Sequence, residues 1–200
     1  METVKKIYHN NTNIWRLPPE KFALMVVNTA AELKDAPYNN ALLCKENFDK
    51  LGYFTNIMMN PSLLEFDALL HQSLLAVTDR VVIYYYGHSN RDGRWKMKDG
   101  YIDMERMKQL ITKSRHCKKL TFMLDTCYAS NFNLPDCTII CSSGATEESH
   151  QKAFNDKEYG VLTYFFWKYF DNPHCIGLLE MILKKFGQSM QIRGEKEMLF

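Results

Sequence analysis

The fold is decided by two apolar stretches, Val81-Val82-Ile83-Tyr84-Tyr85-Tyr86-Gly87-His88 and Leu120-Thr121-Phe122-Met123-Leu124-Asp125-Thr126-Cys127. Each is rich in β-branched and aromatic residues, is too short for a buried helix and is bounded by turn residues, so each predicts a buried strand of a parallel sheet. In an open α/β sheet, groups just beyond the carboxyl ends of neighbouring strands share one crevice, where ligands bind. We therefore expect the imidazole of His88 to lie beside the thiol of Cys127.

Strands and helices are expected to alternate along the rest of the chain. Apolar patterns predict further strands at 22–28, 53–59 and 137–142, and helices at 40–51, 62–76, 103–113, 161–170 and 177–187. Ser62 is expected to cap the second of these helices. The polar stretch 145–158 reads as a loop, and residues 1–20, which end in Pro18-Pro19, read as an irregular N-terminal arm. The pattern indicates one α/β domain over residues 21–200, with a mostly parallel sheet flanked by helices on both faces.

Composition excludes several functional classes. The 200 residues carry a net charge of +2 and no cluster of Lys and Arg, so no nucleic-acid partner is expected. The six cysteines form no C-x-x-C pair, which indicates reduced thiols and a cytoplasmic protein. The first residues lack an apolar segment after their charges, and no apolar run approaches about 18 residues. We therefore expect neither a secretory signal nor a membrane span or membrane partner.

A thiol and an imidazole at neighbouring strand ends make a nucleophile and a base. Taken alone, each residue is more often structural, because a cysteine behaves as a small buried hydrophobe. Together they predict acyl transfer, in which the thiolate of Cys127 attacks a carbonyl and His88 delivers a proton to the leaving amine. The backbone N–H groups of Ser89 and Cys127 are the expected donors to the oxyanion.

These residues resemble motifs of the caspase-like cysteine peptidases, and of the metacaspase and paracaspase branch more than of the true caspases. Those families end one strand in Y-x-G-H-G and a later one in D-x-C-x-x-G. Here 85–89 reads Tyr-Tyr-Gly-His-Ser and 125–130 reads Asp-Thr-Cys-Tyr-Ala-Ser, with weaker likenesses at 39–41, 100–103, 142–148 and 159–164. The resemblance implies a caspase-like α/β/α sandwich and a cofactor-free thiol endopeptidase with His88 and Cys127 as its catalytic dyad.

The resemblance also places Asp125 at the acidic position of the S1 pocket. A buried carboxylate needs a partner, and an Arg or Lys side chain of a peptide substrate supplies one, so cleavage after a basic P1 residue is expected. Tyr86 stands where metacaspases carry a small serine, and Asn40 stands where they carry a second S1 aspartate. Both changes reduce the size or charge of the pocket. An alternative stays open, in which Asp125 merely hydrogen-bonds loop amides.

The segments that bind calcium in many metacaspases read Asp-Met-Glu at 103–105 and Asn-Phe-Asn-Leu-Pro at 131–135. Calcium takes six to eight oxygens, several of them charged, so we expect calcium independence and no metal site. Two other activities remain open besides a peptidase acting on a protein or peptide substrate. One is a catalytically silent interaction protein, favoured by Ser89 and Tyr86 beside His88. The other is a transamidase, because the glycosylphosphatidylinositol transamidase resembles residues 125–127. A homodimer formed through a sheet edge, as in caspases, is also kept open.

Overall fold

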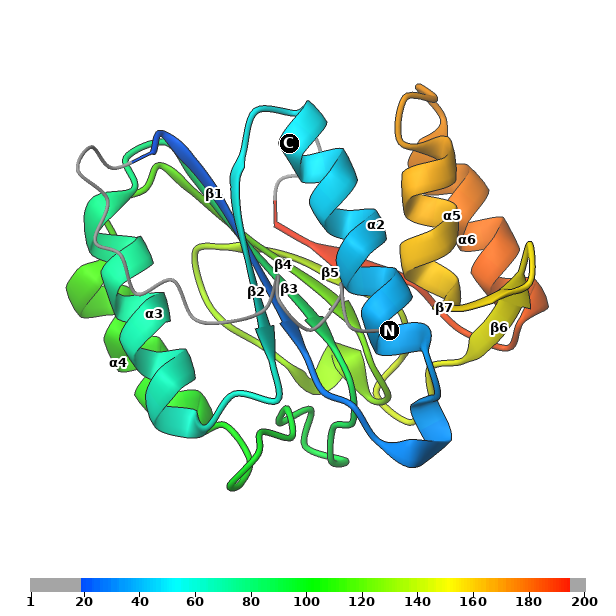
Figure 1. The fold of residues 1–200 in the computed structure, drawn as a ribbon, viewed down its shortest axis with the longest axis horizontal. Coiled ribbons are helices and arrows are strands. Elements are labelled where there is room, and N and C mark those ends of the chain that lie inside the picture. The colour runs from blue at the N-terminus through cyan, green and yellow to red at the C-terminus, as the bar shows by residue number, and fades with distance from the viewer. Residues whose placement is uncertain (1–18, 195–200) are drawn as a thin grey trace, which may run out of the picture.

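The central sheet has six strands in the order β2-β1-β3-β4-β5-β8 (Figure 1). The computed structural model describes residues 19–194, so the predicted arm falls almost wholly outside the described residues. Five strands are parallel, and the sixth runs antiparallel to β5. They are β1 Lys21–Val27, β2 Phe54–Met59, β3 Arg80–Tyr86, β4 Lys119–Asp125, β5 Thr138–Cys141 and β8 Gln191–Arg193.

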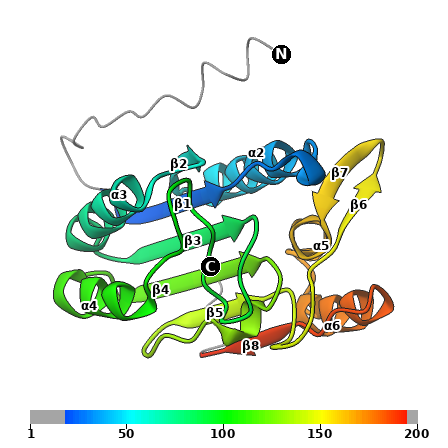
Figure 2. The same cartoon turned by 90° about the horizontal axis from the view of Figure 1, so that it is seen from below.

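Helices cover both faces of this sheet, as Figure 2 shows. One face packs against α3 (Leu63–Ala76) and α4 (Met104–Ser114), and the other against α2 (Ala36–Lys50), α5 (Val161–Tyr169) and α6 (Cys175–Lys185). Two short 3-10 helices, η1 (Ala31–Leu33) and η2 (Ala129–Asn131), lie in loops. The mostly parallel sheet flanked by helices, expected from the sequence, is confirmed. Among residues 19–194, no helix combines the length and the apolar character needed to cross a bilayer.

Strand β3 explains why the sequence is apolar without alternation. Val81, Ile83 and Tyr85 belong to the core on the α3 and α4 side, whereas Val82, Tyr84 and Tyr86 belong to the core on the other side. All six side chains are buried. Successive strand residues point to opposite faces, so a strand covered on both faces reads as a continuous apolar run.

Helix boundaries follow local signals. Ser62 caps α3, as expected: its hydroxyl accepts a hydrogen bond from the Glu65 N–H at 3.2 Å, and the Glu65 carboxylate accepts one from the Ser62 N–H at 2.8 Å. Helix α2 begins at Ala36, four residues before the predicted start, and has Pro37 in its first turn, where proline is favoured. Helix α6 begins at Cys175, two residues before the predicted Gly177.

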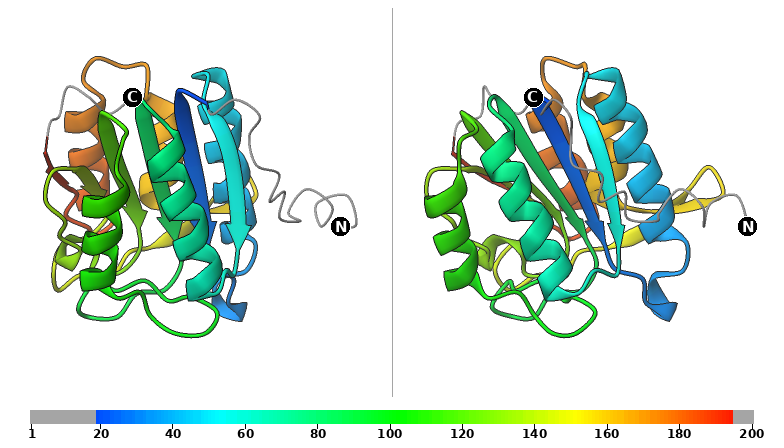
Figure 3. Two further views of the ribbon diagram at one scale, coloured as in Figure 1. Left: turned by 90° about the vertical axis from the view of Figure 1, so that its left-hand side faces the viewer. Right: turned by 60° about the vertical axis from the view of Figure 1, so that its left-hand side comes forward.

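The chain changes direction across the sheet between β1 and β3. Strand β2 lies on one side of β1, and the later strands β3, β4 and β5 are added on the other side (Figure 3). Loops that leave two such strands turn away from each other, and the crevice between them at the carboxyl ends is the usual ligand site of open α/β sheets. Here the loop after β1 leads into η1, and the loop after β3 carries His88.

The prediction of a loop over 145–158 is wrong in its second half. Strands β6 (Gln151–Phe154) and β7 (Lys157–Gly160) form an antiparallel hairpin. Its turn residues Asn155 and Asp156 have φ values of 50° and 64°, the left-handed region that two-residue hairpin turns need and that Asn and Asp tolerate. Strand β8 at the sheet edge was also not predicted.

Candidate active site

The register of β3 and β4 places the predicted dyad at one edge of the sheet. Tyr86 and Asp125, the last residues of the two strands, are paired in the parallel ladder. His88 and Cys127 each follow two residues later, so they leave neighbouring strands at the same level. The expectation that the two residues lie at adjacent strand ends is therefore met by the topology.

Side-chain hydrogen bonds join the two strand ends directly. The Thr126 hydroxyl donates to the Gly87 carbonyl at 2.6 Å, and the Ser89 hydroxyl donates to the Cys127 carbonyl. Buried Tyr85 donates to the His88 carbonyl at 2.6 Å. These three bonds fix the backbone on both sides of the dyad. The Ser89 side chain thus contacts the Cys127 backbone, whereas only the backbone N–H of Ser89 was expected to have a role.

Gly87 occupies a backbone conformation that favours glycine. Its φ is 154°, and a β-carbon there would lie 2.9 Å from the Tyr85 hydroxyl and 3.0 Å from Cβ of Asn28. Any side chain at residue 87 would therefore push against the tyrosine that holds the His88 carbonyl. The glycine keeps the turn into His88 tight.

The Cys127 thiol is partly exposed and accepts a hydrogen bond from the Ser149 N–H at 3.4 Å. Burial raises its pKa, and the negative charges of Glu148 and Asp125 act in the same direction. The thiol is therefore protonated in the resting state. Within the described residues no hydrogen bond joins this thiol to the His88 ring, so a base must approach it when substrate binds.

The His88 ring makes its contact elsewhere. Its Nε2 lies 2.8 Å from Oε1 of Glu32, a residue of η1. The sequence did not single out Glu32, because an isolated glutamate in the polar stretch 29–35 carries no motif. Its position 56 residues before His88 makes the contact visible only in the folded chain.

The two backbone groups expected to bind an oxyanion are the N–H groups of Ser89 and Cys127. In the part of the chain that the structure describes, neither donates a hydrogen bond to another residue, although the Cys127 N–H acts on the thiol of its own residue. Unpaired backbone N–H groups are rare in folded proteins, so both remain candidates for binding a ligand oxygen.

The three residues expected to line S1 converge on Gly160, just before α5. The Gly160 N–H donates to Oδ1 of Asn40 at 3.2 Å, and a β-carbon at residue 160 would lie 2.1 Å from Oδ2 of Asp125 and 2.8 Å from the Tyr86 ring. The structure thus brings Asn40, Tyr86 and Asp125 together, although they come from three separate elements.

Asp125 is 1% exposed, and its carboxylate is already engaged. Oδ1 accepts from the Ser149 hydroxyl at 2.8 Å, and Oδ2 accepts from the Thr163 N–H at 2.9 Å and the Thr163 hydroxyl at 2.7 Å. Thr163 lies in the first turn of α5, where backbone N–H groups have no partner within the helix. Burial raises the pKa of Asp125, and these hydrogen bonds oppose the rise. The alternative stated for Asp125, hydrogen bonds to loop amides, does not describe these contacts, because two of the three donors are hydroxyls and the one amide, that of Thr163, belongs to α5.

The other two residues expected to line S1, Tyr86 and Asn40, are also buried. The Tyr86 hydroxyl donates to Oε1 of Gln151 at 3.1 Å. Nδ2 of Asn40 is buried and has no hydrogen-bond partner among the described residues. Asn40 and the Asp125 carboxylate both lie against Gly160, and Ser149 contacts both that carboxylate and the Cys127 thiol.

The segments compared with calcium sites serve local structure. The Asp103 carboxylate caps α4 by accepting from the Glu105 N–H at 2.9 Å and the Arg106 N–H at 3.2 Å. The Asn131 side chain donates to the carbonyls of Arg91 and Ala145. Over residues 19–194, no group of three or more His, Cys, Asp or Glu side chains is arranged to hold a metal ion.

No protein-family model matches the sequence, and no curated protein matches it either. The case for a function therefore rests on the residues and their geometry.

Proposed function

We propose that this protein is a cysteine endopeptidase with a caspase-like α/β/α sandwich fold, and that it cleaves peptide bonds after Arg or Lys. The observation that carries the proposal is the pairing of Tyr86 with Asp125, which sets His88 and Cys127 at the same level of adjacent strands. The bonds from Thr126 to Gly87 and from Ser89 to Cys127 hold the two strand ends together. The motif resemblance around both residues supports the same assignment.

In the proposed reaction, His88 takes the proton from the Cys127 thiol, and the thiolate forms a bond to the substrate carbonyl carbon. The carbonyl electron pair moves to oxygen, which the N–H groups of Ser89 and Cys127 receive. When that pair returns, the C–N bond breaks, and the leaving amine takes the proton from the imidazolium. Water then attacks the thioester and gives a proton to His88. The C–S bond breaks, and the thiolate recovers that proton.

The preference for a basic P1 residue is proposed on the chemistry of Asp125. A carboxylate has about four acceptor sites, and three are used by Ser149 and Thr163. A guanidinium or ammonium group reaches Asp125 by replacing the Ser149 hydroxyl on Oδ1. Such a cation offsets the cost of burying the carboxylate, which the hydrogen bonds offset only in part. Calcium is not required in this proposal, because Asp103 is used as a helix cap.

A catalytically silent interaction protein is the second candidate, and one observation favours it. The thiol and the imidazole each contact another group, Ser149 and Glu32 respectively, instead of each other. In an active enzyme these contacts must yield when substrate enters the crevice.

Peptide cleavage separates the two candidates. Purified protein is incubated with fluorogenic peptides that end in Arg, Lys, Asp or Asn, in calcium or in chelator. The matched variants are Cys127→Ala and Cys137→Ala, because Cys137 is another partly exposed thiol. We expect cleavage after Arg and Lys that chelator does not affect, that Cys127→Ala abolishes and that Cys137→Ala retains. Cleavage after Asp or Asn would overturn the S1 assignment. No cleavage by a protein with a cooperative unfolding transition would favour the silent candidate.

A further inference from the structure

Glu32 contacts His88 beyond the carboxyl ends of the paired strands β1 and β3. Glu32 belongs to η1 in the loop after β1, and His88 follows β3, so the two residues come from the two loops that flank the point where the sheet reverses its order. The distance from Oε1 of Glu32 to Nε2 of His88 is 2.8 Å. Among the described residues, Glu32 is the one charged group in contact with this ring.

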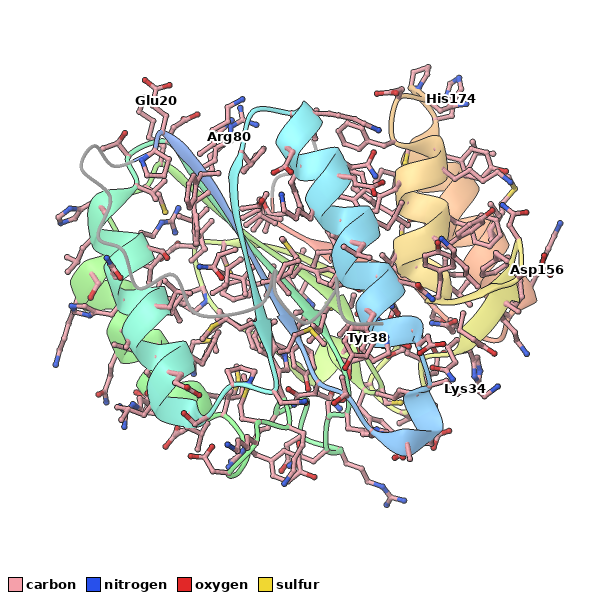
Figure 4. The ribbon with its side chains drawn as sticks, in the orientation of Figure 1. Glu20, Lys34, Tyr38, Arg80, Asp156 and His174 are labelled. Carbon is pink, nitrogen blue, oxygen red and sulfur yellow. The ribbon has the colours of Figure 1, made fainter. Side chains whose placement is uncertain are left out.

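The η1 loop is held in place from the β6–β7 hairpin. The Gln151 amide donates to the Glu32 carbonyl at 3.1 Å. Two residues after Glu32, Lys34 forms an ion pair with Glu158 at 3.0 Å, and Figure 4 shows Lys34 between the start of α2 and the hairpin. Asn39 donates to the Glu158 carbonyl at 2.9 Å. The position of Glu32 beside the His88 ring therefore depends on the bonds that anchor its loop to the hairpin, as well as on its own contact with the ring.

A carboxylate can only accept a hydrogen bond, so Nε2 of His88 must carry the proton in this contact. In a neutral imidazole the other nitrogen, Nδ1, is then the acceptor. The pKa of Glu32 is held below its usual value by a hydrogen bond from its own backbone and by the contact with His88, so the group is ionised near neutral pH. Its negative charge also stabilises the ring when the ring becomes positive.

We propose that Glu32 is a positioning residue that fixes His88 with its proton on Nε2 and leaves Nδ1 as the nitrogen that exchanges protons with Cys127 and the leaving amine. The inference rests on the proposed peptidase function for its catalytic consequence. During acylation Nδ1 takes the thiol proton, the ring becomes an imidazolium between Glu32 and the reacting atoms, and Nδ1 then gives that proton to the amine. The proton on Nε2 stays where it is throughout.

The test combines nuclear magnetic resonance with kinetics on the full chain. Glu32→Gln keeps an acceptor but removes the charge, and Glu32→Ala removes both. Glu180→Gln is the matched control, because Glu180 is an exposed carboxylate on α6. The ¹⁵N shifts of the His88 ring report which nitrogen carries the proton. This readout is recorded in Cys127→Ala, so it does not depend on activity.

We expect the Nε2–H form of His88 in the parent protein and a mixture of the two neutral forms in Glu32→Ala, which lacks the acceptor. In the active enzyme, kcat falls about two- to fivefold in Glu32→Gln with KM unchanged. Glu180→Gln changes none of these quantities.

An Nδ1–H form in the parent protein, or the same ratio of the two neutral forms in Glu32→Ala as in the parent, would overturn the inference even if the protein is an active peptidase. A parent protein without peptidase activity that still has the Nε2–H form, and loses it in part in Glu32→Ala, would overturn the proposed function instead, and would leave the pairing of Glu32 with His88 established.

Discussion

Gly160 packs so tightly against Asp125 that a β-carbon at residue 160 would stand 2.1 Å from the carboxylate oxygen Oδ2. The backbone at Gly160 has a φ of −64°, which any residue can adopt, so the glycine is required by space and not by conformation. The start of α5 therefore lies directly against the Asp125 carboxylate. Thr163, in the first turn of the helix, donates hydrogen bonds to the same oxygen.

We expect Gly160→Ala to destabilise the fold by about 1–3 kcal/mol or more, because Asp125 and its hydrogen bonds must shift to admit the methyl group. The matched control is Gly177→Ala in α6, where a β-carbon would meet nothing within 4 Å. That substitution should raise stability by about 0.4–1 kcal/mol. Urea denaturation measures both values, and equal effects of the two substitutions would contradict the close approach.

Thr126→Val tests the hydrogen bond that joins the two strand ends. Valine keeps the shape of threonine but leaves the Gly87 carbonyl without the hydroxyl that donates to it at 2.6 Å. We expect a loss of about 1–3 kcal/mol in the free energy of unfolding and a fall in kcat of about tenfold, since small displacements of a dyad are costly. Thr112→Val on the exposed face of α4 serves as control and should stay within about 0.5 kcal/mol. A Thr126→Val enzyme with unchanged kcat would show that the bond does not position the dyad.

Asp125→Asn separates the charge of the proposed S1 carboxylate from its hydrogen bonds. The amide oxygen can accept from Thr163 while the amide nitrogen donates to the Ser149 hydroxyl, so stability should change by about 1 kcal/mol or less. The loss of the charge should lower kcat/KM for peptides with P1 Arg or Lys by about a hundredfold. The selectivity ratio is kcat/KM for these peptides divided by kcat/KM for peptides with an uncharged P1 residue. It is measured for the parent enzyme and for the variant. A ratio that survives the substitution would place P1 recognition elsewhere.

The Cys127 thiol should react slowly with iodoacetamide at neutral pH. Burial raises its pKa above the usual value, so at a given pH it holds less thiolate than an exposed cysteine. Below the pKa the alkylation rate should rise about tenfold per pH unit, because it follows the thiolate fraction. Mass spectrometry of the peptide that contains residue 127 measures the rate separately from the other cysteines.

Glu148→Gln removes one of the negative charges that raise the pKa of this thiol. The lowered pKa should increase the alkylation rate about twofold, a small effect because Glu148 is exposed and screened by solvent. Glu180→Gln should leave the rate unchanged. If Cys127 instead reacts faster than free glutathione at pH 7, the thiol is activated already in the resting state and its pKa lies on the other side of the usual value.

The sheet and the positions of His88 and Cys127 at neighbouring strand ends could be predicted because the signal is local. Strands β3 and β4 are continuous apolar runs, and chemistry at the ends of two parallel strands must meet at one edge. The β6–β7 hairpin had a local signal too, the Asn155-Asp156 pair, but the polar residues around it concealed the strands. Strand β8 has three residues and is stabilised by pairing with β5, so no pattern of its own marks it.

The partners of the dyad could not be predicted, because they depend on contacts between distant segments. Glu32 meets His88 across 56 residues, and Ser149 meets Cys127 across 22. Neither partner belongs to an apolar pattern or a motif. For Asp125 the sequence offered loop amides as alternative partners, but it could not show that Thr163 at the start of α5 donates two of the three hydrogen bonds.

The side chain of Gln151 uses both ends of its amide. Its oxygen accepts from the Tyr86 hydroxyl, and its nitrogen donates to the Glu32 carbonyl. One planar group thus spans the wall of the candidate specificity pocket and the loop that faces the imidazole. If the Gln151 amide rotates to suit a different residue at position 86, its oxygen and nitrogen exchange places. The oxygen then faces the Glu32 carbonyl and cannot donate a hydrogen bond to it. The proposed substrate preference and the position of the His88 ring are therefore coupled through Gln151. A substitution that changes one of them also affects the other.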